Sequence, residues 1–338
     1  MKVVHAGIFK DHCLGGDIIF KKGFEANGCE VEAFDYRQRI NERGEAAMHA
    51  ELIEQCIGKD LLFIGKGEKL SKACLSKIKK SGVSIALWFG DFCMTPKPWL
   101  NDILSQVDFY FLSSGRKVLQ KHFDMGKPGS ASFYFNPIDP SILQQFPNTF
   151  DKSTNILFTA SKHRKLIMTE REATIDYLLT RNDVKFFGDA NIKGLDLLLT
   201  KLGLKAKPPK VRGADYIREI YQTKIGIGVN LIQSIPRYTS DRLQHFMGLG
   251  TFYMPWYFPE LELFFKDGEE IVPFHSIQDL EQQLSYFLHE EAHREQIAKA
   301  GMERCLKDYN TQAIVAMMLD VMKHGKSDKY PWCMTIDH

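Results

Sequence analysis

The sequence predicts an α/β protein built from two Rossmann-like domains that face each other across a cleft. Short, mostly apolar runs rich in β-branched and aromatic residues alternate with amphipathic stretches. This alternation is typical of strands buried in a parallel sheet and of the helices that cover them. The alternation stops once and starts again, and 338 residues are more than one hydrophobic core usually serves.

The first series contains six runs with the character of buried strands. These runs are Val3–Ile8, Val31–Phe34, Leu61–Ile64, Ser84–Phe89, Val107–Leu112 and Ala131–Phe135. Between the first two, Asp17–Asn27 is expected to be a helix, because Asp17 suits an N-cap and Gly28 suits the position after the helix.

The segment Asn136–Asn148 interrupts the pattern with three prolines and no clear period, which indicates an interdomain linker. We therefore expect an N-terminal domain at residues 1–148 and a second domain at residues 149–310. A C-terminal helix and tail at residues 311–338 follow, and the fold allows them to cross back to the first domain.

The second series predicts five strands and six helical segments. The strands are Asn155–Thr159, Val184–Phe187, Ile225–Val229, Thr251–Met254 and Ile271–Phe274. The helices are Glu170–Thr180, Ala214–Gln222, Ser240–Met247, Ile277–His289 and Ala292–Tyr309, the last continuing into Thr311–His324. Gly325–His338 has no regular pattern.

Composition and cysteine usage exclude several classes of protein. The formal net charge of +2 gives no indication of a strongly charged partner. The first residues lack the apolar core of a signal peptide, and no run of about 18 apolar residues occurs. The seven cysteines are scattered and never spaced C-x-x-C, which favours reduced thiols in the cytoplasm over disulfides or a structural zinc site.

The first domain offers two candidate motifs. Gly15 and Gly16 precede the first helix, where backbone N–H groups can approach a phosphate or sugar; a plain strand–helix turn is the alternative. Asp91 follows a strand and is a candidate general base, although most such residues cap a turn. His12 is the rival base, and a His12–Asp91 pair would hold the imidazole in one tautomer.

The second domain offers two groups that suit a diphosphate. Ser161, Lys162 and Arg164 follow its first strand, where cations can bind phosphate oxygens; a solvated basic turn is the alternative. Ser240 or Asp241 is expected to cap a helix whose free N–H groups, with Arg242 beside them, favour an anion.

Three further patterns are interpreted as structural or left open. His289–His293 matches H-E-x-x-H, but its polar neighbours favour two helix ends separated by a turn over a zinc site. Gly65-Lys66-Gly67 lacks a phosphate-loop pattern and is interpreted as a solvated turn. Lys201–Arg212 carries five positive charges and no acid, so it is either a solvated loop or a contact for an anionic acceptor such as nucleic acid or a lipid head group.

From Tyr238 onward the sequence resembles the CgeB-like (spore maturation protein-like) glycosyltransferases. The resemblance is specific over Thr223–Tyr309 and diffuse before it. The segments that carry it are Tyr238–Leu243 (YTSDRL), Gly248–Gly250 (GLG), Tyr257–Phe265 (YFPELELFF), Asp267–Glu270 (DGEE), Leu288–Arg294 (LHEEAHR) and Ala298–Gly301 (AKAG).

The resemblance implies a GT-B fold and a metal-independent transfer of a sugar from a nucleotide-diphosphate sugar, with no further cofactor. The donor binds mainly to the second domain and the acceptor to the first. Carried over by position, Ser161, Lys162 and Arg164 face the diphosphate, and Gly188 lies near the nucleobase. The phosphate or sugar end of the donor is assigned to Ser240, Asp241 and Arg242, and Tyr238 is counted as a further donor-binding residue.

One departure from the family pattern concerns the donor. Many GT-B enzymes carry a glutamate, which holds the ribose hydroxyls, where this chain has His245. The acceptor is left open among a glycan, a protein, a small molecule and a hydroxylated base of DNA. A nucleotide-sugar epimerase and a non-catalytic nucleotide-sugar-binding module are the remaining alternatives.

Overall fold

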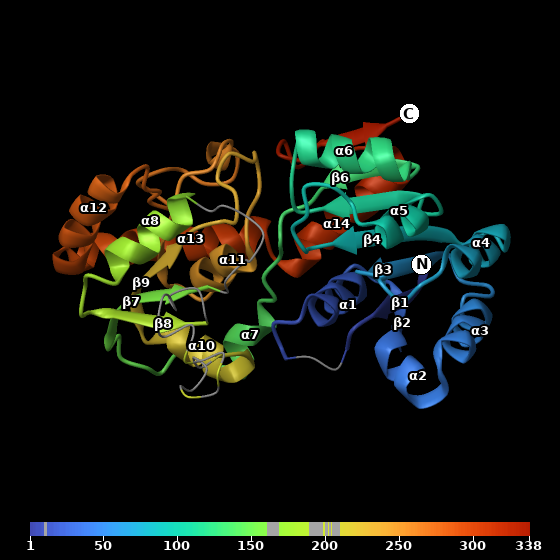
Figure 1. Cartoon of the computed structure of the whole chain (residues 1–338), viewed down its shortest axis with the longest axis horizontal. Helices are drawn as coiled ribbons and strands as arrows, with labels where there is room; N and C mark the ends of the chain where they lie inside the picture. Colours follow the sequence, from blue (N-terminus) through green and yellow to red (C-terminus); the bar gives the residue numbers. More distant parts are fainter. Residues whose placement is uncertain (10–11, 161–168, 189–198, 200–201, 203, 205–209) are drawn as a thin grey trace. The chain divides into compact units, whose positions relative to one another are not determined.

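The computed structural model describes the chain except for residues 10–11, 161–168, 189–198, 200–201, 203 and 205–209 (Figure 1). The chain forms two compact units. Unit 1 comprises Met1–Asp139, Ile235–Thr239 and Asp308–His338, and unit 2 comprises Pro140–Ser234 and Ser240–Lys307.

The units divide at Asp139, nine residues before the end of the predicted first domain. The start of the expected linker belongs to unit 1 because its backbone is bonded there. The N–H of Ile138 donates to the carbonyl of Tyr309 at 3.0 Å, and the N–H of Thr311 donates to the carbonyl of Ile138 at 2.9 Å. The rest of the segment contains the short helix α7 (Ser141–Gln145).

Unit 1 has a seven-stranded sheet with the order β11-β6-β5-β4-β3-β1-β2. Its first six strands along the chain are parallel. They are β1 (Lys2–Gly7), β2 (Glu30–Asp35), β3 (Leu61–Gly65), β4 (Ser84–Phe89), β5 (Phe109–Leu112) and β6 (Ser130–Phe133). The strand order reverses between β1 and β3, and in such sheets ligands bind at the carboxyl edge beside this switch point.

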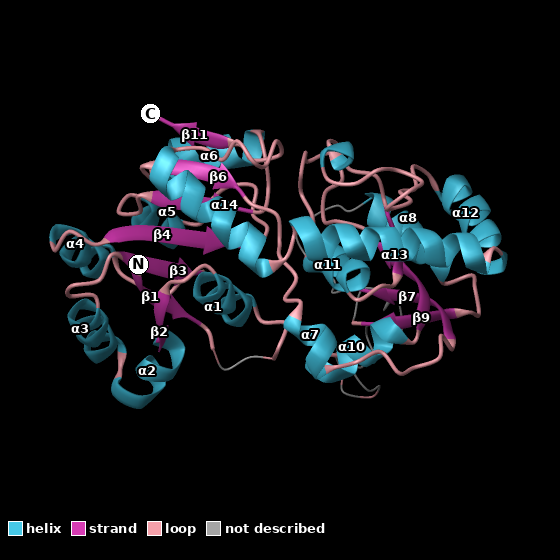
Figure 2. Cartoon of the chain, turned by 180° about the vertical axis from the view of Figure 1, so that it is seen from behind, coloured by secondary structure: helices cyan, strands magenta, loops and turns pink. Residues whose placement is uncertain are grey.

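Helices connect these strands and pack on the sheet (Figure 2). They are α1 (Gly16–Ala26), α2 (Tyr36–Arg43), α3 (Glu45–Gln55), α4 (Lys72–Lys80), α5 (Pro98–Leu104) and α6 (Lys117–Gly126). The C-terminal helix α14 (Thr311–His324) packs against α1. The hydroxyl of Thr311 donates to the carbonyl of Ile19 at 2.8 Å, so the C-terminal helix is part of unit 1.

The C-terminal tail differs from the irregular segment that the sequence predicted. Residues Thr335–Asp337 form β11, which pairs antiparallel with β6 at the edge of the sheet. The hydroxyls of Ser132 and Thr335 lie 2.9 Å apart across this pair. A three-residue edge strand has too short a period to be recognised in a sequence.

Unit 2 has a four-stranded parallel sheet with the order β10-β9-β7-β8. The strands are β7 (Thr154–Thr159), β8 (Val184–Phe187), β9 (Thr223–Gly228) and β10 (Phe252–Pro255). The described helices are α7, α8 (Thr169–Leu178), α10 (Gly213–Tyr221), α11 (Asp241–Gly248), the 3₁₀ turn η1 (Leu261–Leu263), α12 (Ile277–His289) and α13 (Glu291–Asp308).

Two predictions for the second half were wrong. Ile271–Phe274 is buried but forms only isolated bridges, because Pro273 has no N–H to donate to a ladder. The last helix does not continue through residue 310. Asn310 caps a new helix by accepting the N–H of Ala313 at 2.9 Å, which ends the previous one.

Two glycines in β9 shape the core of unit 2. A Cβ on Gly226 would lie 2.2 Å from the ring of Phe246, and one on Gly228 would lie 1.7 Å from the hydroxyl oxygen of Tyr253. The Phe246 and Tyr253 rings stack with centroids 5.4 Å apart. The glycines therefore let α11 and β10 approach β9 closely. Among the described helices, none has the length and apolar character to cross a membrane.

The packing of α14 on α1 generates a stability prediction. A Cβ on Gly23 of α1 would lie 2.6 Å from the Thr311 hydroxyl and 2.6 Å from a methyl of Val315. We expect Gly23→Val to lower the free energy of unfolding by about 2–3 kcal/mol, because overpacking forces the helices apart. Glu25→Ala on the exposed side of α1 is the control, with a change below about 1 kcal/mol. Urea unfolding measures both, and equal effects would contradict the close packing.

Candidate functional site

A cavity of about 220 Å³ opens at the carboxyl edge of the unit 2 sheet. Its described lining comes from the ends of β7 and β8, the start of α10 and the start of α11. The lining residues are Thr159, Ala160, Phe187, Gly188, Lys210, Val211, Arg212, Tyr216 and Arg242. Three of these side chains are cationic and none is acidic, so the cavity suits an anion.

Arg242 joins the ends of two strands at the point where the order of this sheet reverses. Its Nη1 donates to the carbonyl of Thr159 at 2.8 Å, and its Nη2 donates to the carbonyl of Val229 at 3.0 Å. The buried Nε has no hydrogen-bond partner among the described residues. The guanidinium is thus held in place by backbone carbonyls, which leave its positive charge uncompensated by a carboxylate there.

Gly188 brings two stretches of backbone together beside the cavity. Its φ is +92°, and a Cβ at this position would lie 2.2 Å from the carbonyl oxygen of Ala160. Both the dihedral angle and the contact exclude a side chain. The absence of one leaves backbone exposed at the cavity wall, where a flat group can lie against it.

Two tyrosines surround Arg242 and support it. Tyr216 is hydrogen-bonded to Thr159, and Tyr253 is hydrogen-bonded to Arg242 and Ser240. Burial raises the pKa of both phenols above the usual value. Tyr216 therefore stays protonated at neutral pH, and its hydroxyl remains a hydrogen-bond donor at the cavity wall.

The predicted residues on α11 have different environments. Ser240 occupies the N-cap position, but its side chain does not cap the helix and instead meets Tyr253. Asp241 is exposed in the first turn. His245 is 9% exposed and meets Tyr216 edge to face with ring centroids 5.7 Å apart. It is not among the described residues that line the cavity.

Tyr238 belongs to unit 1 and is not among the described residues that line the cavity. Its ring packs on Phe92 with centroids 4.6 Å apart. The segment around it is bound to the same unit, because the N–H of Gly115 donates to the carbonyl of Pro236 at 3.2 Å. Ser161, Lys162 and Arg164 lie outside the described residues.

In unit 1, the carboxylate of Asp17 lies at the start of α1, next to Gly15 and Gly16 in the sequence. Asp17 is 5% exposed. It accepts hydrogen bonds from Nε2 of His5 at 3.0 Å, the N–H of Ile8 at 2.7 Å and Nε1 of Trp88 at 3.2 Å. The start of α1 therefore has its own anion, and the glycines allow close packing: a Cβ on Gly16 would lie 2.4 Å from the Trp88 ring.

The two candidate bases each contact another group among the described residues. Nδ1 of His12 accepts the N–H of Leu14 at 3.2 Å. The Oδ2 of Asp91 lies 2.6 Å from Nζ of Lys66, with the two side chains 58% and 37% exposed. Lys66 has a φ of +62°, a conformation that costs a side-chain-bearing residue about 1 kcal/mol or more.

No group of three or more metal-binding side chains occurs among the residues that the structure describes. The H-E-x-x-H pattern spans a break between helices, since α12 ends at His289 and α13 begins at Glu291. The next residue, Arg294, is 1% exposed and donates to the carbonyl of Phe287 at 2.7 Å. Arg294, which directly follows the pattern, therefore ties the start of α13 to the end of α12.

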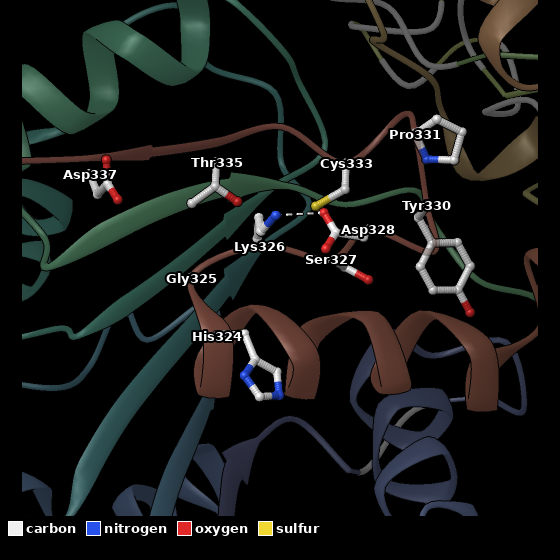
Figure 3. A pocket seen from close by; sticks show the side chains of 10 residues that line it. All are labelled: His324, Gly325, Lys326, Ser327, Asp328, Tyr330, Pro331, Cys333, Thr335 and Asp337. Carbon is white, nitrogen blue, oxygen red and sulfur yellow. Dashed lines mark ion pairs between the residues drawn. The ribbon is translucent and has the colours of Figure 1, made fainter.

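A larger pocket of about 520 Å³ lies at the C-terminal tail of unit 1 (Figure 3). Its lining carries the acids Asp328 and Asp337 beside Lys326 and His324. Nζ of Lys326 pairs with Asp328 at 2.8 Å. This pocket offers no excess of positive charge, so the cavity in unit 2 is the better anion site.

Comparisons with known proteins agree with this geometry. Residues 171–320 match the family model described as glycosyl transferase-like, and no curated protein matches in sequence. HepE from Anabaena, solved with UDP and glucose, has a TM-score of 0.61 at 10% identity, covering 96% of this chain and 99% of that one. Sucrose-phosphate synthase from Thermosynechococcus elongatus has a TM-score of 0.56 at 12% identity, covering 96% and 98%.

The chain has the GT-B fold. A further structure with this likeness is an alpha-glucosyltransferase solved with UDP and a 13-mer DNA that contains an HMU base. Its TM-score is 0.66 at 10% identity, and the match covers 96% of this chain and 99% of that one. Identities this low establish the fold alone.

Of the described lining residues of the cavity in this GT-B chain, the sequence predicted Gly188 and Arg242 as site residues. The polar lining residues that it missed are Thr159, Lys210, Arg212 and Tyr216. Lys210 and Arg212 stood in a basic run that was interpreted as a solvated loop or an acceptor contact. A signal was present, because Arg212 and Gly213 directly precede α10, and the start of a helix favours anions. Nothing in the sequence indicated that Tyr216 turns toward Thr159.

The close approach at Gly188 generates a prediction for this site. We expect Gly188→Ala to lower the free energy of unfolding by more than about 2 kcal/mol, because strain and a backbone clash add. Gly268→Ala is the matched control, since Gly268 has a φ of +73° but nothing within 4 Å of an added Cβ. It should cost only about 1 kcal/mol. Chemical denaturation measures both, and equal losses would show that Ala160 can move aside.

Proposed function

We propose that this protein is a metal-independent glycosyltransferase that moves a hexosyl group from a nucleotide-diphosphate sugar to an acceptor hydroxyl. The observation that carries the proposal is the cavity at the strand-order reversal of the unit 2 sheet, whose described lining is cationic and contains no acid. Ligands of open α/β sheets bind at this place, and three cations suit a diphosphate.

Arg242, Lys210 and Arg212 bind the diphosphate in this proposal. Arg242 is held by two carbonyls, so its position is set before the donor binds and little reorganisation is needed. The nucleobase lies against the backbone at Gly188, where no side chain intervenes. The hydroxyl of Tyr216 donates a hydrogen bond to an oxygen of the bound nucleotide sugar.

The chemistry follows from where charge develops. The acceptor oxygen forms a bond to the anomeric carbon, and the bond from that carbon to the diphosphate oxygen breaks. Both electrons of the broken bond leave with the nucleoside diphosphate, whose added negative charge the three cations stabilise. The acceptor proton passes to a base of unit 1, for which Asp91 and His12 are the candidates.

The comparisons support the nucleotide-sugar donor in this proposal and do not identify the acceptor. HepE was solved with UDP-glucose as well as with UDP, which favours a uridine nucleotide as the first donor to test. The segments that resemble CgeB-like glycosyltransferases include Arg242 and the buried Arg294. We place the enzyme in the cytoplasm, where its cysteines, all free, stay reduced.

A hydroxylated base of DNA is the second candidate acceptor, because the alpha-glucosyltransferase of the same fold was solved with DNA. This acceptor predicts duplex binding that weakens steeply with salt. An epimerase would instead interconvert nucleotide sugars with no acceptor present, and a binding module would hold them without turnover. Incubation of the donor alone and with DNA separates these alternatives.

A thermal-shift screen against nucleoside diphosphates and their sugars, without added metal, tests the proposal. A ligand at about 100 times its Kd stabilises the protein by about 2.7 kcal/mol. We expect a selective response to one nucleotide. If no nucleotide stabilises the protein at millimolar concentration, the donor site proposed for unit 2 is wrong.

The cations of the cavity generate a binding prediction. We expect Arg212→Ala and Lys210→Ala each to weaken binding of the responding nucleotide diphosphate by about 10-fold or more, because a charge-assisted hydrogen bond contributes about 1.5–3 kcal/mol. Lys299→Ala is the control, since the Lys299 side chain is 78% exposed elsewhere in unit 2. Isothermal titration calorimetry gives the affinities. A uniform small loss in all three variants would mean that only net charge matters.

A further inference from the structure

Lys66 and Asp91 form an ion pair at the carboxyl edge of the unit 1 sheet. Lys66 directly follows β3 and Asp91 lies two residues after β4, and these strands are neighbours. The order of this sheet reverses between β1 and β3, so Lys66 stands at the switch point where open α/β sheets bind ligands. The sequence had suggested only a solvated turn at Lys66.

The backbone on both sides of Lys66 is tightly held, and Lys66 itself has a left-handed φ. A Cβ on Gly65 would lie 1.8 Å from a carboxylate oxygen of Asp17, so the strand ends tightly against that buried acid. The N–H of Lys66 donates to the carbonyl of Trp88 at 3.2 Å, and the N–H of Gly67 donates to the carbonyl of Gly65 at 2.7 Å. With φ at +62°, the side chain of Lys66 reaches Asp91.

This arrangement contributes little to stability. Exposed ion pairs are close to neutral in their contribution to folding, and a left-handed backbone is unfavourable for lysine. A glycine at position 66 would adopt the same backbone without strain. The ion pair therefore at most offsets the conformational free energy that the left-handed backbone of Lys66 costs. Backbone strain of this kind is concentrated at functional sites.

We propose that Lys66 is a positioning residue that holds the Asp91 carboxylate for proton transfer from the acceptor. This inference rests on the proposed function. Only Oδ2 of Asp91 has a partner among the described residues, at 2.6 Å from the lysine nitrogen. Oδ1 remains available to take the proton of the acceptor hydroxyl. In the same step the acceptor oxygen bonds to the anomeric carbon, and the nucleoside diphosphate leaves with the electrons of the broken bond. Lys66 itself exchanges no proton in this step.

The test uses the full chain with a nucleotide sugar that stabilises it, and water serves as the acceptor. Turnover of the donor to free sugar and nucleoside diphosphate is measured for the wild type, Lys66→Met, Lys66→Arg and Asp91→Asn. We expect kcat to fall about tenfold or more in Lys66→Met and Asp91→Asn, with donor KM and nucleotide Kd unchanged. Lys66→Arg should recover most of kcat, because it keeps the charge beside Asp91.

A matched ion pair at the other edge of the sheet provides the control. Nζ of Lys79 lies 2.6 Å from Asp108, and its side chain is 43% exposed. Asp108 directly precedes β5 and thus stands at the amino edge. We expect Lys79→Met to keep the wild-type kcat. We also expect Lys66→Gly to lose kcat while its melting temperature stays equal to or above that of the wild type.

The outcomes separate this inference from the proposed function. Wild-type kcat in Lys66→Met would overturn the positioning role while leaving the transferase intact. A fall in kcat that parallels a fall in melting temperature would assign the pair a structural role and also overturn it. If the double variant Lys66→Met, Asp91→Asn loses kcat by the product of the two single-variant losses, the two residues act independently and the inference is wrong. Absence of nucleotide binding and turnover in the wild type would instead contradict the proposed function.

Discussion

The arrangement of the cavity in unit 2 depends on one side chain, Arg242. Two parallel strands that diverge at a switch point leave free carbonyls at their ends, and Arg242 donates to one of them from each side. This bond pair satisfies the carbonyls and fixes a guanidinium at the edge of the sheet. Because carbonyls hold it and no carboxylate of the cavity lining does, its charge remains available to an anion.

The rest of unit 2 makes this arrangement possible. Gly226 and Gly228 let Phe246 and Tyr253 approach β9, which brings the start of α11 to the strand ends. Gly188 closes the other side through its contact with Ala160. Unit 1 differs at its own switch point, where the buried carboxylate of Asp17 accepts hydrogen bonds from His5, Ile8 and Trp88.

Strands and helices were predictable wherever period and capping agreed. The sequence placed β4, β8 and α12 with their observed bounds. It failed at β11, which is too short to show a period, and at Ile271–Phe274, where burial without pairing imitates a strand. For the site, Arg242 and Gly188 carried signals in their own segments. The Lys66–Asp91 pair and the contact of Tyr216 with Thr159 did not, because both join residues that are distant in sequence.

The measurement that tests the central claim most directly is hydrogen–deuterium exchange of the full chain with and without saturating UDP. A nucleoside diphosphate bound at Arg242 should slow exchange in the stretches that line the cavity, at residues 159–160, 187–188 and 211–216. The C-terminal pocket at residues 324–337 should exchange as before. Protection confined to that pocket, or no protection in unit 2 under conditions where UDP is bound, would contradict the account.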